Sequence, residues 1–219
     1  MTDVPLIFTG PMIRALLDGR KTMTRRLDVE RWRSRNAGTR VWVRETWQTG
    51  MGPNGPQIAY RATPDYFDID AWDGPDEGIG PSFNYDKCPG ATWHTNLGDL
   101  LSGAEGAWRS PIHMPRWASR LTLLVESVKV ERLQDISEAD ALAEGCFQGK
   151  ATGRIFENPG SARLGSSEWA NARDWYADLW ESLHGEDAWT ANPWVAAITF
   201  GAIKSNIDAL PAPAAEQSK

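Results

Sequence analysis

One short basic turn carries the residues with the clearest chemical potential. It reads Gly19-Arg20-Lys21-Thr22-Met23-Thr24-Arg25-Arg26 and places a lysine three positions before a threonine, among three arginines. Cations packed this closely repel one another, and repulsion combined with partial burial lowers a lysine pKa toward neutrality. Such a lysine can act as a base, and a threonine hydroxyl beside it can become a nucleophile. The alternative is structural: Gly19 caps a helix, and the cations favour the negative end of its dipole.

Glu144 is the second candidate. Ser137 and Asp140 form a Ser-x-x-Asp variant of the capping box, so a helix is expected to begin after Ser137 and to end at Gly145. Glu144 then lies on the last turn, where the helix dipole disfavours negative charge. Pairing with Lys21 would explain its position, and a plain surface glutamate is the alternative. Neither of these two side chains is expected in the apolar core.

A third group consists of His113, Arg116 and Trp117, which lie close together in a loop held by prolines. Such a polar and aromatic cluster can stack on a nucleobase and hydrogen-bond to it. The alternative is that Trp117 packs in the core and Arg116 caps a neighbouring carbonyl group. The three histidines and two cysteines have no zinc-site spacing, so neither a metal nor a cofactor is predicted.

The basic turn resembles the Gly-x-Lys-x-x-(Thr or Glu)-x-Arg signature of the ASCH family, a group of PUA-like β-barrels. Gly19, Lys21, Thr24 and Arg26 stand at its positions. A threonine at the sixth position is similar to the small bacterial N4-acetylcytidine amidohydrolases of that family, which use a lysine, this threonine and a glutamate from a later helix.

Three further segments carry the same resemblance. Residues 133–145 resemble the family's glutamate-bearing helix, with Glu144 on the glutamate position. Residues 41–43 resemble a family strand, although Thr39 replaces the usual aspartate before it, and residues 194–200 resemble the final strand. The resemblance covers residues 5–48 and 116–203, and the whole chain is similar to longer ASCH proteins common in phages and prophages.

The resemblance implies an α+β fold: a PUA-like (ASCH) partly open β-barrel with flanking helices and a long irregular insertion. It also implies hydrolysis of an N4-acyl amide on cytidine or a related modified nucleoside. Lys21 would be the base and Glu144 would orient it, while Thr24 would either attack or position a water. Arg26 and Arg44 would stabilise an oxyanion or a phosphate. The expected substrate-binding residues are Arg26, Arg44, His113, Arg116 and Trp117.

The charge distribution keeps two other function classes open. The net charge of −6 argues against phosphate contacts over the whole surface. Ten basic residues nevertheless fall between Arg14 and Arg44, a pattern that suits a local anionic ligand such as a nucleotide or a single strand of RNA or DNA. A binding module for nucleic acid or a modified base, and a nuclease that uses the same basic cleft, are therefore alternatives to the amidohydrolase.

Periodicity predicts the elements that must position these residues. Helices are expected over 11–19 and 168–183, and strands over 5–9, 40–47, 58–61, 121–133 and 194–200. Residues 62–111 are predicted to form an irregular insertion, and residues 147–167 a mobile loop. A single domain over 1–205 and a disordered tail over 206–219 follow. Without a signal segment or a membrane-length apolar run, we expect no membrane partner and a cytoplasmic location.

Overall fold

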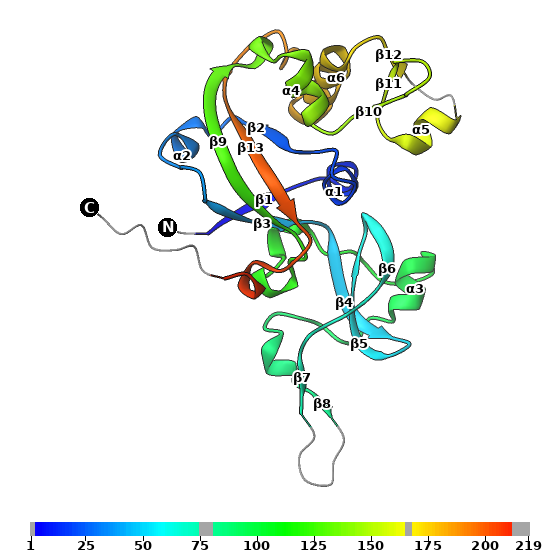
Figure 1. The fold of residues 1–219 in the computed structure, drawn as a ribbon. Coiled ribbons are helices and arrows are strands. Elements are labelled where there is room, and N and C mark those ends of the chain that lie inside the picture. Colours follow the sequence, from blue (N-terminus) through cyan, green and yellow to red (C-terminus); the bar gives the residue numbers. More distant parts are fainter. Residues whose placement is uncertain (1–2, 75–80, 165–167, 212–219) are drawn as a thin grey trace, which may run out of the picture.

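The computed structural model describes residues 3–74, 81–164 and 168–211. Its centre is a five-stranded sheet in the order β1-β3-β9-β13-β2 (Figure 1). Strand β1 pairs with β3 in parallel, and the other three pairs are antiparallel. The strands are β1 Val4–Ile7, β2 Met23–Arg26, β3 Arg40–Arg44, β9 Thr122–Arg132 and β13 Trp194–Ile203.

The central sheet curls until its two edge strands, β1 and β2, approach each other. Arg26 of β2 donates from Nη2 to the carbonyl of Ile7 at 2.9 Å, and Arg31 of helix α2 (Val29–Arg33) donates to the carbonyl of Pro5 at 3.3 Å. Side chains rather than a backbone ladder therefore bridge the two edges, and the sheet is partly open. The interior is filled by apolar side chains of the sheet and of helices α1 (Gly10–Leu17) and α2.

A smaller helical unit covers one end of this sheet (Figure 1). It contains helices α4 (Glu138–Ala143), α5 (Pro159–Leu164) and α6 (Ala172–His184) and the short strands β10 (Phe147–Gln148), β11 (Ile155–Phe156) and β12 (Glu168–Trp169). The described part of residues 147–167, predicted as a mobile loop, thus contains two paired strands and a helix. Ile155 is fully buried in the core of this unit, against aromatic side chains of α6.

The predicted insertion is also more regular than expected. It contributes strand β6 (Thr63–Asp68) to an antiparallel sheet and packs helix α3 (Leu97–Ser102) on that sheet. The other two strands, β4 (Trp47–Gly52) and β5 (Gly55–Tyr60), precede the insertion, and β5 overlaps the strand predicted over 58–61. A two-stranded hairpin of β7 (Trp72–Asp73) and β8 (Ser82–Phe83) projects beyond this sheet (Figure 1). The single strand predicted over 40–47 is in fact divided, since β3 and β4 belong to different sheets.

The start of the predicted tail packs against the body of the protein. The Asn206 side-chain amide donates to three carbonyl groups of residues 116–119, and Ile207 is fully buried. Residues 212–219 of that tail lie outside the described residues. Within the described part of the chain, no helix has both the length and the apolar character needed to span a membrane.

Candidate active site

The basic turn caps the ends of two helices. The backbone N–H groups of Gly19, Arg20 and Lys21 donate to carbonyls in the last turn of α1, and Gly19 has a φ of +72°, so Gly19 caps α1 as the structural alternative expects. The same turn also caps the end of helix α4. Three consecutive carbonyls at the end of α4 accept hydrogen bonds from three consecutive residues of the turn. The contacts are Thr22 N to Ala143 O at 2.9 Å, Lys21 Nζ to Glu144 O at 2.9 Å, and Arg20 Nη1 to Gly145 O. Carbonyls at a helix C-terminus lack partners within the helix and favour nearby cations, so this contact stabilises both segments.

Gly145 makes this close approach possible. Its φ of +113° lies in the region that side-chain-bearing residues rarely adopt. A Cβ atom on it would come within 2.9 Å of the Ala15 Cβ and 3.0 Å of the Lys21 Cβ. Any larger residue would therefore push the basic turn away from α4.

Lys21 and Glu144 form a buried ion pair at this junction. Lys21 Nζ lies 2.7 Å from Glu144 Oε2, and the two residues are 0% and 3% exposed. The sequence analysis expected both side chains to lie outside the core, and this expectation was wrong, because both are buried. The other carboxylate oxygen of Glu144 accepts from Arg25 Nη1 at 3.2 Å, and Arg25 also contacts Glu131 at 2.8 Å and Asp140 at 3.2 Å.

Burial dominates the electrostatics of this cluster. Burial lowers the pKa of Lys21 below its ordinary value; the charge of Glu144 opposes this shift, whereas the charges of Arg26 and Arg25 add to it. Burial, followed by the charge of Glu144, raises the pKa of Tyr176 well above its ordinary value. Burial also raises the pKa of Cys146 to about 12, which leaves that thiol unsuited to nucleophilic attack.

Thr24 and Arg26 lie on strand β2, although the sequence placed them in a loop. They pair with Ile198 and Ala196 of β13, and strand alternation puts both side chains on one face. Arg26 lies over the Phe8 ring at 4.9 Å, and its buried Nε has no hydrogen-bond partner among the described residues. Thr24 is 3% exposed.

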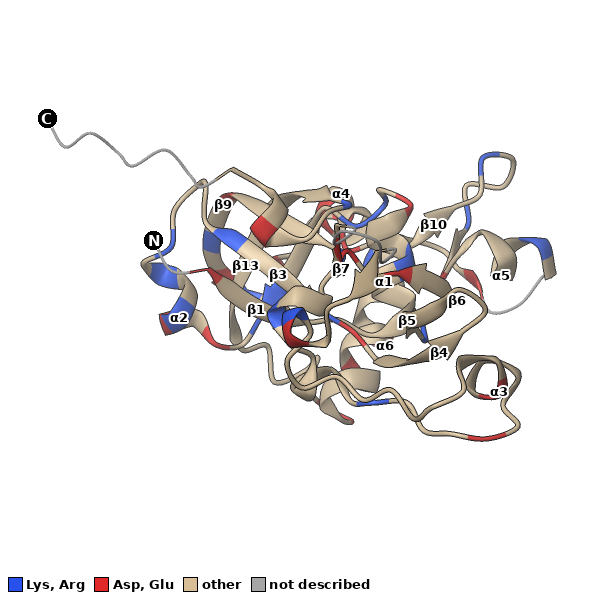
Figure 2. Cartoon of the chain, turned by 90° about the horizontal axis from the view of Figure 1, so that it is seen from below, with Lys and Arg blue, Asp and Glu red and all other residues tan. Residues whose placement is uncertain are grey.

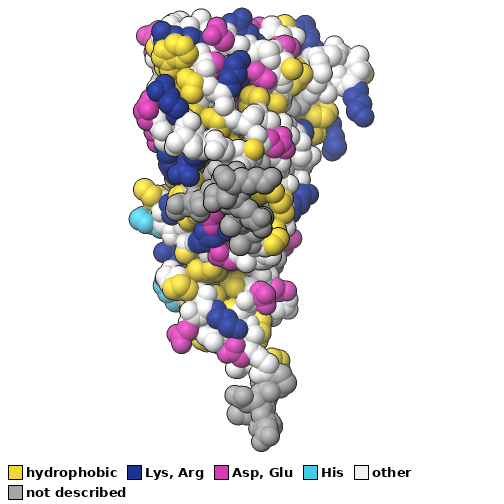
Figure 3. Space-filling view, turned by 60° about the vertical axis from the view of Figure 1, so that its left-hand side comes forward, with side chains coloured by type: hydrophobic (Ala, Val, Ile, Leu, Met, Phe, Trp, Pro, Cys, Tyr) yellow, Lys and Arg dark blue, Asp and Glu magenta, His cyan; other side chains and the backbone are white. Residues whose placement is uncertain are grey.

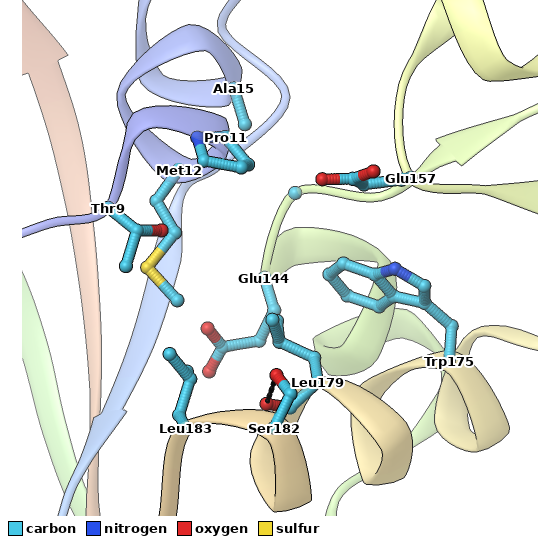
Figure 4. A pocket seen from close by; sticks show the side chains of 11 residues that line it. Thr9, Pro11, Met12, Ala15, Glu144, Glu157, Trp175, Leu179, Ser182 and Leu183 are labelled. Carbon is cyan, nitrogen blue, oxygen red and sulfur yellow. Dashed lines mark hydrogen bonds between the residues drawn. The ribbon is translucent and has the colours of Figure 1, made fainter. Parts of the chain in front are cut away.

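Two adjoining cavities meet at Glu144. The small cavity, about 70 Å³, lies between β2 and helix α6. The large cavity, about 270 Å³, lies between α1, the end of α4 and α6, with the Glu144 carboxylate extending between Met12 and Leu183 (Figure 4). The small cavity is lined by Met12, Thr24, Arg25, Arg26, Leu27, Glu144, Tyr176, Leu179, Trp180, Leu183 and His184. The large one is lined by Thr9, Pro11, Met12, Ala15, Glu144, Gly145, Glu157, Trp175, Leu179, Ser182 and Leu183. Lys21 does not line either cavity. It contacts Glu144, which lines both.

Helix α6 supplies a wall of the site that the sequence did not predict. The helix predicted over 168–183 has an apolar stripe at Trp169, Ala172, Trp175, Leu179 and Leu183, and such a stripe favours a core position. Leu179 and Leu183 nevertheless line the cavities, and Leu183 is 44% exposed. Tyr176, one position beyond that stripe, contributes to the small cavity as well. An amphipathic helix has apolar residues whether it faces a core or a cavity, so its periodicity could not separate the two.

Four of the predicted substrate-binding residues lie elsewhere, and none of them lines either cavity among the described residues. Arg44 donates to the Ile112 carbonyl at 3.3 Å, and His113 is an exposed member of a 3₁₀ turn. Arg116 pairs with Asp3 at 2.5 Å and with Asp208 at 2.6 Å. The indole of Trp117 donates to the Pro89 carbonyl and packs edge-on against Trp47. Trp117 therefore packs against the core, as the structural alternative expects, whereas Arg116 binds two carboxylates and not the expected carbonyl group.

The basic segment from Arg14 to Arg44 does not form one positive surface. Lys21 and Arg25 are buried in ion pairs, Arg33 pairs with Glu30, and Arg40 pairs with Asp3. Lysine and arginine alternate with acidic residues along the chain in Figure 2 and over the face shown in Figure 3. The fold thus distributes neighbouring cations of the sequence to different places.

The described residues contain no group of three or more His, Cys, Asp or Glu side chains arranged to hold a metal ion. Comparison with protein-family models, with curated proteins and with solved structures gave no match. The functional argument therefore rests on the geometry around Glu144.

Proposed function

We propose that the protein hydrolyses an N4-acyl amide on cytidine or a related modified nucleobase. One observation carries the proposal: a buried Lys21–Glu144 pair adjoins a cavity lined by Thr24 and Arg26, and the buried Arg26 Nε–H has no hydrogen-bond partner within the described residues. A base, a hydroxyl and an oxyanion donor are the three groups that acyl transfer requires. The ASCH resemblance adds the substrate class.

Lysine chemistry supports a base at this position. The Lys21 nitrogen has three directions beyond its own carbon, and acceptors of Glu144 occupy two of them, at 2.7 and 2.9 Å. A neutral amine still has two N–H donors for these contacts and leaves a lone pair in the third direction. Lys21 can therefore lose its proton and keep both hydrogen bonds, and its lowered pKa favours that loss.

The reaction that we propose starts with proton transfer to the Lys21 amine, either from the Thr24 hydroxyl or from a water held by Thr24. The freed oxygen attacks the acyl carbon, and the Arg26 Nε–H donates to the resulting oxyanion. The carbon–nitrogen bond to the exocyclic amine then breaks, and the Lys21 ammonium returns the proton to that nitrogen. If Thr24 attacks, a water hydrolyses the acyl-threonine ester in a second round and releases the carboxylic acid.

The two cavities suit the two parts of such a substrate. The small cavity lies beside Thr24 and Arg26 and has room for a short acyl group. The large cavity has apolar walls from Met12, Leu179 and the buried Trp175, against which a planar base can pack. Glu144 lies at the junction, next to the amide that would be cleaved.

The test is a panel of N4-acylated cytidines, presented as nucleosides and within short RNA and DNA strands, with products separated by chromatography. We expect release of cytidine and the carboxylic acid by the wild-type protein. Thr24→Val should lower turnover by about 10²-fold or more, since it removes the hydroxyl but keeps the shape. Arg33→Gln, which changes an exposed arginine of α2, is the matched control.

Absence of hydrolysis across the whole panel, by a folded wild-type protein, would contradict the proposal. Tight binding of an acylated base without turnover would do the same, and it would favour the binding-module alternative.

A further inference from the structure

A third cavity, of about 420 Å³, lies at the first turn of helix α1, where the β4–β6 sheet approaches the central sheet. Thr9 and Pro11 line both this cavity and the large cavity beside Glu144, so the two adjoin. In Figure 1, α1 lies between the helical unit on one side and β4 to β6 on the other. We call this space the arginine cavity; it is lined by Ile7, Phe8, Thr9, Gly10, Pro11, Arg14, Glu45, Thr46, Arg61, Ala62 and Pro111.

The wall of the arginine cavity has an excess of positive charge. Arg14 is held there because its Nη1 donates to the Ala62 carbonyl at 3.2 Å. The Arg61 guanidinium makes no ion pair with any described residue. Glu45 is the single carboxylate among the lining residues, and Arg120 binds both of its oxygens, at 2.8 and 2.9 Å. Two cations thus face the cavity without a free carboxylate to balance them.

The backbone adds to this preference for an anion. Helix α1 begins at Gly10 within the cavity wall, its first turn has no acidic residue, and the Thr9 side chain does not cap it. Pro11 has no N–H group, but the remaining N–H groups of the first turn, together with the positive end of the helix dipole, favour a phosphate. The helix end and the two arginines therefore act in the same direction.

We propose that the arginine cavity binds a phosphate attached to the ribose of the substrate. The preferred substrate is then an acylated nucleotide, free or within a strand, rather than a free nucleoside. This inference rests on the proposed function, because it assigns the base of the substrate to the large cavity and its phosphate to the adjoining arginine cavity. It also involves Arg61, which follows β5 and lies outside the segments that carry the ASCH resemblance.

Three substrates test the inference: N4-acetylcytidine, its 5′-monophosphate, and a short single-stranded RNA that contains one N4-acetylcytidine. We expect kcat/KM to be at least about tenfold higher for one of the phosphate-bearing substrates than for the nucleoside, the scale of a charge-assisted contact. A preference for the monophosphate indicates a free nucleotide, and a preference for the RNA indicates a strand. Equal kcat/KM for all three would overturn the inference and leave the proposed function intact.

Substitution of the two arginines locates the phosphate. Arg14→Gln and Arg61→Gln should each lower the ratio of kcat/KM for the preferred substrate to that for the nucleoside, and the double variant should bring this ratio to about one. Arg33→Gln is the control, because it removes a similar charge on α2. A ratio that survives in the double variant would contradict the assignment.

A binding measurement separates this inference from the proposed reaction. Calorimetry with cytidine and cytidine 5′-monophosphate needs no turnover. If no acylated substrate is hydrolysed, tighter binding of the monophosphate that depends on Arg14 and Arg61 would still support the phosphate site. Equal binding of the two ligands by the wild-type protein would contradict it.

Discussion

Two ion pairs, each with a buried carboxylate, border the cavities on either side of the first turn of α1, and they differ in construction. Arg120 binds both oxygens of Glu45, donates to the Thr63 hydroxyl at 2.8 Å and stacks over the Tyr60 ring at 4.0 Å. Lys21 makes one contact with the carboxylate of Glu144 and one with its backbone carbonyl. The first pair uses most of its hydrogen-bonding capacity, and the second leaves one direction of the lysine nitrogen open.

This difference separates a structural pair from a reactive one. A guanidinium stays charged at every pH at which proteins fold, and its planar donors match a carboxylate. Arg120, which precedes β9, therefore links this part of the chain to β5 and β6, and we expect it to have a structural role. A buried ammonium can release its proton, and we propose that Lys21 does so beside the cavity lined by Thr24. The choice of cation, rather than the presence of a buried ion pair, distinguishes the two regions.

Exchanging the two cations should have the largest effect. Lys21→Arg keeps the charge but removes the transferable proton, so turnover of an acylated cytidine should fall by about 10²- to 10⁴-fold. Arg120→Lys should keep nucleoside turnover and lower the free energy of unfolding by about 1–3 kcal/mol, because it loses the two-point contact. Steady-state kinetics and urea unfolding of both variants measure these effects.

Retained turnover in folded Lys21→Arg protein would remove Lys21 as the base. Loss of turnover in folded Arg120→Lys protein would contradict a purely structural role for the Arg120–Glu45 pair.

Arg26 should show the next largest effect. Arg26→Met removes the buried Nε–H from the small cavity, so kcat should fall by about 10²-fold, while KM changes less. Arg31→Met is a matched control, because Arg31 also bridges to β1 but does not line the cavity. Similar kcat values for the two variants would indicate that Arg26 only holds the sheet edges together.

The pH dependence of stability should give the smallest effect, with opposite signs for the two pairs. The native pKa of Lys21 lies below its ordinary 10.5, so between these values only the unfolded state binds the proton, and stability rises with pH. Burial raises the native pKa of Glu45 above its ordinary 4.5, so in that window only the native state binds the proton, and stability falls as pH rises.

Each slope is limited to about 1.4 kcal/mol per pH unit, the value for one proton. Urea unfolding across pH should show that Lys21→Met removes the alkaline rise and Glu45→Gln removes the acid fall. Unchanged slopes in these variants would assign the pH dependence to other groups.

The sequence predicted the central sheet and α1 well, because their local patterns match their final environment. The helix expected over 11–19 is Gly10–Leu17, and the strand expected over 121–133 is Thr122–Arg132. Strand β2 was missed, because its charged residues Arg25 and Arg26 are stabilised by partners far away in sequence, such as Glu131 and the Ile7 carbonyl. The β4–β6 sheet was missed in part because its strands are short and interrupted by glycine and proline.

The candidate site was predicted in the same uneven way. Lys21 and Glu144 carried a recognisable signature and lie in contact. The contribution of Tyr176 and Leu183 depends on where α6 lies across the cavities from α1 and β2, which no local spacing encodes. The cluster from His113 to Trp117 was misleading, because the ion pairs of Arg116 with Asp3 and Asp208 join three distant segments.

The most direct test of a proton-accepting Lys21 is its own titration. The chain has six lysines, so ¹³C labelling at the lysine ε-carbon gives a simple NMR spectrum, and Lys21→Arg identifies the Lys21 signal. We predict that Lys21 titrates below the ordinary lysine value of 10.5 in the folded protein. A Lys21 signal that stays in the ammonium form up to and beyond that pH would contradict the account.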